Sequence, residues 1–262
     1  MRQVFFTLSL SVTALSAAPI STYYLTAGDN GANIIIQGGV ATVYAQQYPG
    51  NGGEYAIAVD STVRTLSNGN SGAGTGAQYD LGFSFTGTSY TYPNPSYAFY
   101  DGTTDGAYNY SVDYSAGGVY RMGLDWSNPV LLFQTPSSYL GITYDPGNSS
   151  LWVSGFGSDT VMNVTMAGAL LSSFNTGFSS ISSLALDPAD GTLWMGSQNT
   201  QGTFYQFSRA GALLGTSAFE NLIQYNTLGG EFSTGGAAVP EPSTWAMMGL
   251  GLAAAALARK RR

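Results

Sequence analysis

The chain repeats itself at intervals of about 42 residues, and this repeat limits the folds open to it more than any other feature. The segments Gly141–Pro146 and Leu151–Val153 recur as Ser183–Pro188 and Leu193–Met195. One aspartate and one tryptophan of each copy are displaced by about 42 residues from the first copy to the second. A repeat of this length implies several copies of one supersecondary unit that pack on each other.

Two weaker copies lie upstream and keep the spacing. Tyr55–Asp60 and Tyr97–Asp101 repeat the first strand and its terminal aspartate. Each unit has room for four short strands separated by Gly, Asn and Asp, and none has the 3.6-residue apolar stripe of a helix. This pattern is typical of β-propeller blades, so we predict an all-β fold of that kind, with a β-sandwich as the alternative.

The clearest unit predicts where the strands of a blade begin and end. We place its four strands at Leu140–Tyr144, Leu151–Gly155, Thr160–Thr165 and Leu170–Phe174.

The two ends of the body predict how the ring closes. The N-terminal unit offers second, third and fourth strands at Tyr23–Thr26, Asn33–Ile36 and Val40–Val43, but no first strand precedes them. One surplus strand remains near the other end, at Ile223–Ser233. Docked beside Tyr23–Thr26, it would leave no incomplete blade. We therefore predict a five-bladed β-propeller over residues 19–234, closed by a C-terminal strand.

The N-terminal residues have the order of an export signal. Arg2 precedes the largely apolar stretch Val4–Ala14, which is followed by the small residues Ser16, Ala17 and Ala18. A basic residue, a short apolar run and small residues are the three parts of a secretory signal peptide. We predict a signal peptide over residues 1–18, with a buried N-terminal helix as the alternative.

The C-terminal residues also fall into three parts. A linker from residue 235 leads to Pro240, Glu241 and Pro242, and the charge-free run Trp245–Ala258 comes next. As a helix this run would span about 21 Å, short of a hydrocarbon core of about 30 Å. Four basic residues that would stop translocation end the chain, namely Arg259, Lys260, Arg261 and Arg262.

This tail closely resembles the PEP-CTERM sorting signal of Gram-negative bacteria. The resemblance covers about the last two dozen residues and implies recognition by an exosortase, a membrane enzyme, after passage through the inner membrane. It implies a short transmembrane helix within residues 235–262, processing near the motif, and a place at the cell surface, in the extracellular polysaccharide or in the biofilm matrix. A plain single-pass anchor is the alternative. One sorting tail serves many unrelated domains, so the activity of the body is a separate question.

Composition excludes several kinds of chemistry. The chain has no Cys and no His, which removes thiol chemistry, disulfides, the usual zinc sites and imidazole as a base. Between residues 22 and 238, three arginines stand against fourteen acids, a net charge of −11. Nucleic-acid binding requires a basic surface, so we predict no nucleic-acid partner.

Aspartates recur at one position of the repeat, at Asp60, Asp101, Asp145 and Asp187. A ring of carboxylates could hold Ca²⁺ or hydrolyse sugars. The residues that follow, such as Pro146 and Pro188, favour turns that each aspartate caps through the backbone. We therefore predict turn caps, with no metal site, no cofactor and no catalytic residue.

Tyrosines cluster between residues 79 and 120. Exposed rings beside Asn, Asp and Ser suit a polysaccharide, because sugar C–H groups stack on aromatic faces; packing between blades is the alternative. The candidate glycan contacts are Tyr90, Tyr92, Tyr97, Tyr108 and Tyr110. The function predicted is a non-enzymatic binding or structural module of the exopolysaccharide layer, and the alternative is a surface hydrolase or lyase acting on that polysaccharide.

Overall fold

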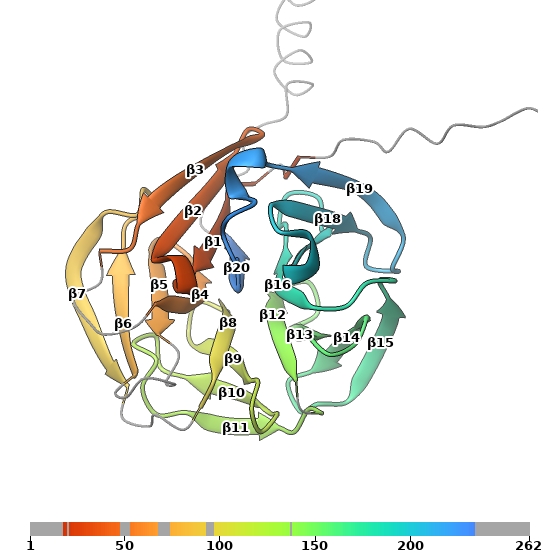
Figure 1. The fold of residues 1–262 in the computed structure, drawn as a ribbon. Coiled ribbons are helices and arrows are strands. Elements are labelled where there is room, and N and C mark those ends of the chain that lie inside the picture. The colour runs from red at the N-terminus through yellow and green to blue at the C-terminus, as the bar shows by residue number, and fades with distance from the viewer. Residues whose placement is uncertain are drawn as a thin grey trace, which may run out of the picture.

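A computed structural model describes residues 18–19, 21–47, 53–67, 74–92, 97–136 and 138–233. These residues form five four-stranded antiparallel sheets arranged around a central axis (Figure 1). The arrangement is a five-bladed β-propeller, which confirms the predicted fold and excludes the β-sandwich. All five blades are completed between residues 21 and 233.

The innermost strands surround the axis and are almost wholly buried, because neighbouring blades cover both of their faces. They are β20 (Gly229–Phe232), β4 (Glu54–Val59), β8 (Phe99–Thr104), β12 (Tyr139–Asp145) and β16 (Ile181–Leu186) of the first to fifth blades.

The middle strands of each blade follow in the same order. The second strands are β1 (Tyr23–Ala27), β5 (Val63–Ser67), β9 (Asn109–Asp113), β13 (Ser150–Gly155) and β17 (Leu193–Ser197). The third strands are β2 (Ala32–Gln37), β6 (Gly74–Tyr79), β10 (Val119–Met122), β14 (Thr160–Thr165) and β18 (Thr203–Phe207).

The outermost strands form the rim of the ring. They are β3 (Val40–Ala45), β7 (Phe85–Tyr92), β11 (Val130–Phe133), β15 (Leu170–Asn175) and β19 (Leu213–Ala218). Three short 3-10 helices join strands at η1 (Gly28–Asn30), η3 (Gln198–Thr200) and η4 (Glu220–Leu222). In the clearest repeat, the predicted strands agree with β12 to β15 to within one residue at each end.

The core is divided among the interfaces between blades. Buried apolar residues form five clusters, and each cluster joins two adjacent blades. In one of them Trp152 of the fourth blade packs with Ile181 and Leu184 of the fifth. A blade therefore buries its faces only by contact with both neighbours, which is the property of a repeat that must close.

The C-terminal strand closes the ring as predicted. β20 pairs antiparallel with β1, so that Tyr23 lies opposite Phe232 and Thr26 lies opposite Gly229. The rings of Tyr23 and Phe232 stack with their centroids 4.5 Å apart, and both side chains are fully buried. The closing strand is shorter than predicted, because the residues before Gly229 form η4 and a loop whose Asn226 bonds Asp29 and Asn30.

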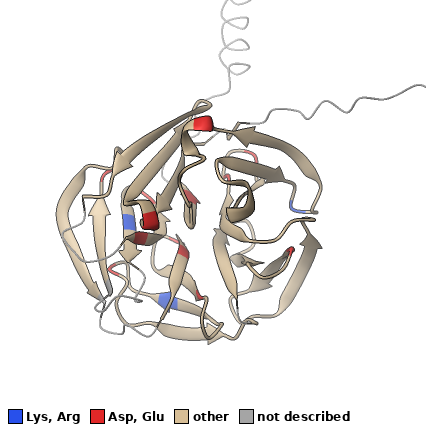
Figure 2. Cartoon of the chain, viewed as in Figure 1, with Lys and Arg blue, Asp and Glu red and all other residues tan. Residues whose placement is uncertain are grey.

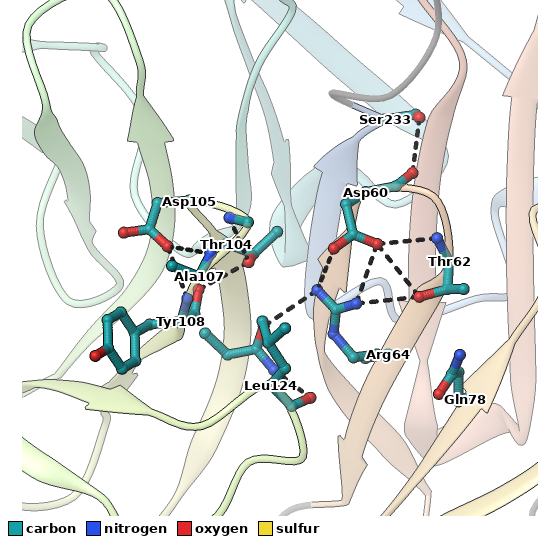
Figure 3. A network of polar contacts seen from close by, with 12 residues as sticks. Asp60, Thr62, Arg64, Gln78, Thr104, Asp105, Ala107, Tyr108, Leu124 and Ser233 are labelled. Atoms are coloured by element: carbon teal, nitrogen blue, oxygen red, sulfur yellow. Dashed lines mark hydrogen bonds and ion pairs between the residues drawn. The ribbon is translucent and has the colours of Figure 1, made fainter.

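Three of the four repeated aspartates cap turns as predicted. The Oδ1 atoms of Asp60, Asp145 and Asp187 each accept a hydrogen bond from the backbone N–H two residues later, at 2.9 Å. Figure 3 shows the first of these turns, in which Arg64 also pairs with Asp60.

The prediction for Asp101 is wrong. Asp101 lies within β8 rather than at its end, and its side chain is fully buried. The turn after β8 is capped by Asp105, whose Oδ1 accepts the N–H groups of Ala107 and Tyr108. In the third blade, the residue that corresponds to Asp60, Asp145 and Asp187 is therefore Asp105, four residues after Asp101.

Glycines at two turns allow close packing between blades. Gly168 and Gly211 have φ values of +82° and +84° in the turns that precede β15 and β19. A Cβ at Gly168 would lie 2.6 Å from Cγ of Phe133 in the preceding blade, and one at Gly211 would lie 2.5 Å from Cβ of Phe174. The recurring Ala-Gly-Ala segments thus let each turn cover an aromatic ring of its neighbour.

We expect Gly168→Ala to lower the free energy of unfolding by about 1–3 kcal/mol more than Gly177→Ala does. Both glycines have a φ of +82°, so both variants carry the same left-handed strain, but a Cβ at Gly177 would meet nothing within 4 Å. Urea unfolding of the two variants measures the difference. Equal losses would show that the contact with Phe133 adds nothing to the backbone strain.

Candidate functional site

A turn of the third blade presents a tyrosine to solvent. The Oδ1 atom of Asp105 accepts the N–H of Ala107 at 2.8 Å and the N–H of Tyr108 at 2.7 Å. Asp105 Oδ2 accepts the hydroxyl of Tyr110 at 2.7 Å. Figure 3 shows this turn, with the ring of Tyr108 extending away from Thr104. The carboxylate of Asp105 thus holds the turn through both of its oxygens.

Arg121 on β10 lies over the ring of Tyr108. Its guanidinium carbon is 4.5 Å from the ring centroid, which is a cation–π contact. The other two arginines of the body form ion pairs, Arg64 with Asp60 at 2.8 Å and Arg209 with Asp145 at 2.9 Å. Arg121 forms no ion pair with any residue that the structure describes.

These groups line a depression between the third and fourth blades with a volume of about 370 Å³. The ring of Tyr144 lies parallel to that of Tyr110, at 6.4 Å between centroids and 9° between planes. We call this the Tyr108 depression; its lining residues are Asp105, Tyr108, Tyr110, Arg121, Leu132, Tyr144, Ser149 and Met166.

The Tyr108 depression combines an apolar surface with hydrogen-bonding groups. The side chain of Tyr108 is 41% exposed, while Tyr110 is almost fully buried. Burial and the neighbouring carboxylate of Asp105 raise the pKa of the Tyr110 hydroxyl, which keeps it protonated and donating to Asp105. An exposed ring, a guanidinium and a few polar atoms are the groups that orient a small polar ligand in a concave site.

The structure separates the five tyrosines that the sequence singled out. Tyr108 and Tyr110 lie together in the depression. Tyr90 and Tyr97 pack at the interface of the second and third blades, and the side chain of Tyr92 lies outside the described residues. Contact between any of the five and a glycan stays a prediction.

Apart from Tyr108 and Tyr110, the sequence analysis selected none of the residues that line the depression. Arg121 had a signal, since it is one of only three bases in the body. Tyr144 had none, because it belongs to the repeat motif of the fourth blade and meets Tyr110 only through the packing of the two blades.

A second polar cluster lies on the propeller axis and is enclosed. Asp101 accepts backbone N–H groups from the innermost strands of three other blades, at 2.9–3.1 Å: those of Ile142, Leu184 and Gly230. Burial raises the pKa of Asp101, and these N–H groups oppose the rise. With both oxygens bonded across the axis, Asp101 links four blades.

Glu231 of the closing strand lies beside Asp101 on the axis. Its carboxyl oxygens accept the hydroxyl of Thr143 at 3.1–3.2 Å, and only 3% of the residue is exposed. Burial raises the pKa of Glu231 to about 8. This carboxyl group is therefore mostly protonated in the folded protein near neutral pH.

We expect the folded protein to lose stability as the pH rises from about 4.5 to about 8. Over this range the unfolded chain has released the proton of Glu231 while the folded chain retains it, so raising the pH favours unfolding. Glu231→Gln should flatten the fall in Tm between pH 5.5 and pH 9. The exposed Glu220→Gln is the control; an unchanged profile in Glu231→Gln would contradict the assignment.

Several sequence predictions concern residues that the structure does not describe. The predicted signal peptide lies almost wholly within residues 1–17, and Pro240, Glu241, Pro242 and Arg259–Arg262 lie in the C-terminal segment; neither segment is described. Across the described ranges, no helix is long and apolar enough to cross a membrane. The same ranges contain no group of three or more acidic residues placed to hold a metal ion.

Comparison with known families identifies the tail. Residues 238–262 match the PEP-CTERM protein-sorting motif. The motif implies an exosortase-targeted protein that is secreted and anchored to the membrane in Gram-negative bacteria. No curated protein sequence matches the chain.

Comparison with solved structures concerns the body. A chain of a nidogen/laminin complex superposes with a TM-score of 0.56 at 13% identity, over 80% of this chain and 97% of that one. Glutaminyl cyclase of Myxococcus xanthus gives 0.47 at 14% identity, over 69% and 71% of the two chains. An inactive virginiamycin B lyase of Staphylococcus aureus with quinupristin gives 0.48 at 14%, over 82% and 72%. Such distant likenesses show at most the fold.

Proposed function

We propose that the body is a non-enzymatic binding module of the exopolysaccharide or biofilm layer and that it holds polysaccharide in the Tyr108 depression. The observation that carries this proposal is the exposed ring of Tyr108 beneath the guanidinium of Arg121, which forms no ion pair within the described part of the chain. A sugar ring would stack on the tyrosine while Arg121 donates to its hydroxyl or carboxylate oxygens.

The groups that line the depression favour binding over hydrolysis. Glycoside hydrolysis generally uses two carboxyl groups on opposite sides of the scissile bond. Asp105 is the one carboxylate among the lining residues of the Tyr108 depression, and its oxygens accept two N–H groups of its own turn and the hydroxyl of Tyr110. A hydrolase or lyase is the rival activity, and the test below separates the two.

The position of the sorting motif fits delivery of a finished domain. The closing strand ends at Phe232, and the motif match begins at residue 238. Processing near Pro240 would therefore release a ring in which every blade is already complete. We propose that the mature body acts at the cell surface or in the surrounding matrix.

The test is to incubate the purified body, residues 19–234, with the exopolysaccharide of its host and to measure both retention and new reducing ends. We expect retention without cleavage. Tyr108→Ala should weaken binding about tenfold or more, since it removes the stacking face, while Tyr108→Phe should bind as the unmodified body does.

The off-site control is Tyr205→Ala on the fifth blade, where a half-buried tyrosine bonds Thr200. New chain ends would support a hydrolase or lyase. Retention that is equal in Tyr108→Ala and the unmodified body would place the glycan contact elsewhere on the propeller.

A further inference from the structure

The outermost strands of the propeller carry no charge. None of β3, β7, β11, β15 and β19 contains an acidic or basic residue, and all five are tan in Figure 2. Proteins commonly protect such edges with charged residues or prolines, because an unpaired strand offers its N–H and C=O groups to another chain. The rim of this propeller therefore lacks protection by charge, although register shifts of the β-bulge kind occur where β7, β11, β15 and β19 pair with their inner neighbours.

At three adjacent blades the uncharged outermost strands also expose apolar side chains. The outermost strands of the third, fourth and fifth blades each begin with two large apolar residues that are exposed. The exposed fractions are 49 and 43% for Val130 and Leu131, 59 and 51% for Leu170 and Leu171, and 57 and 44% for Leu213 and Leu214.

Of these strands, β15 lies in the longest stretch of sequence without a charged residue. The chain carries no charged residue between Asp159 and Asp187, a segment that includes β14, the turn before β15 and the loop after it. β15 is the last strand of its sheet, with β14 on its inner side. By contrast, the edge of β3 is partly covered, because Asn221 donates a hydrogen bond to the carbonyl of Ala41.

The distribution of negative charge favours some contacts between two copies of the body over others. The body has a net charge of −11, and its exposed acids lie in turns and short 3-10 helices, as at Asp80, Asp125 and Glu220. Two copies that met through those loops would place like charges together. Two copies that meet at the rim instead bring together strands that carry no charge.

We infer that the exported body self-associates through its rim, with β15 of one copy adding antiparallel to β15 of a second copy. A strand can pair with its own copy about a two-fold axis, so this contact closes into a dimer. The buried area of one strand edge is small, so the association is weak and depends on concentration. Confinement in a surface layer would raise the local concentration and favour it.

The experiment is sedimentation equilibrium of the purified body over a range of concentrations, with one test variant and one control. Leu170→Lys adds a charge to the β15 edge, while Ile223→Lys adds the same charge to a loop residue that is also 59% exposed. We expect the unmodified body and Ile223→Lys to dimerise alike and Leu170→Lys to weaken the dimer at least tenfold. A cooperative thermal transition in each variant confirms that it is folded.

Three results would overturn the inference: a body that stays monomeric at all concentrations, an equal loss of dimer in both lysine variants, or a dimer that Leu170→Lys leaves unchanged. Because the measurement contains no glycan, its failure is independent of any failure of polysaccharide binding.

Discussion

A chain that ends at residue 228 is expected to have no cooperative thermal transition, whereas a chain that ends at residue 234 keeps it. The shorter chain lacks β20, the innermost strand of the first blade. It loses the pairing with β1 and the fully buried Phe232, and it exposes the edge of β1 together with the strands around the axis.

The size of this effect follows from the interactions that β20 makes in the closed ring. Removing a fully buried Phe side chain alone costs about 3–5 kcal/mol, and the removal of each backbone hydrogen bond adds about 1 kcal/mol. The sum approaches the whole stability of an ordinary domain, about 5–15 kcal/mol. Circular dichroism and limited proteolysis of the two chains measure the outcome; a shorter chain that melts like the longer one would show that β20 is dispensable.

Asp101→Ala is expected to lower the free energy of unfolding by about 3–5 kcal/mol, since each buried donor left without an acceptor costs about 1–3 kcal/mol. The variant leaves the N–H groups of Ile142, Leu184 and Gly230 without their acceptor in a site closed to water. For a body of this size the corresponding fall in Tm is on the order of 10 °C.

Asp80→Ala is the matched control for this variant. Asp80 also accepts two backbone N–H groups, from Gly82 and Ser84, but it is exposed and bonds only within its own turn. We expect it to cost about 1 kcal/mol. If both variants lowered the free energy of unfolding by similar amounts, the contacts of Asp101 across the axis would stabilise the fold no more than an ordinary turn cap does.

The blade count, the strand positions and the closure could be predicted from the sequence because they depend on local patterns. Each blade is a contiguous segment with its own strand and turn signals, so the spacing of Asp145 and Asp187 carries over directly into the spacing of the blades. The N-terminal unit lacked a first strand and the C-terminal end had one strand too many, so the sequence indicated that the last strand completes the first blade.

The two polar clusters could not be predicted in the same way, because they arise where blades meet. Asp101 bonds Gly230, which is 129 residues away along the chain, and nothing near Asp101 indicates that contact. Likewise, Arg121 and Tyr144 reach the Tyr108 depression from different blades. The clustering of tyrosines in the sequence singled out Tyr108 and Tyr110 but gave no means of distinguishing them from Tyr90 and Tyr97, which pack between blades.

The proposal that this exported propeller binds polysaccharide in the Tyr108 depression is tested most directly by mapping the contact residue by residue. Fragments of the host exopolysaccharide would be titrated into isotope-labelled body, and the backbone amide shifts followed by NMR. We expect saturable changes centred on the turn at residues 105–110 and on Arg121 and Tyr144. Saturable changes confined to other blades, or no change at any glycan concentration, would contradict it.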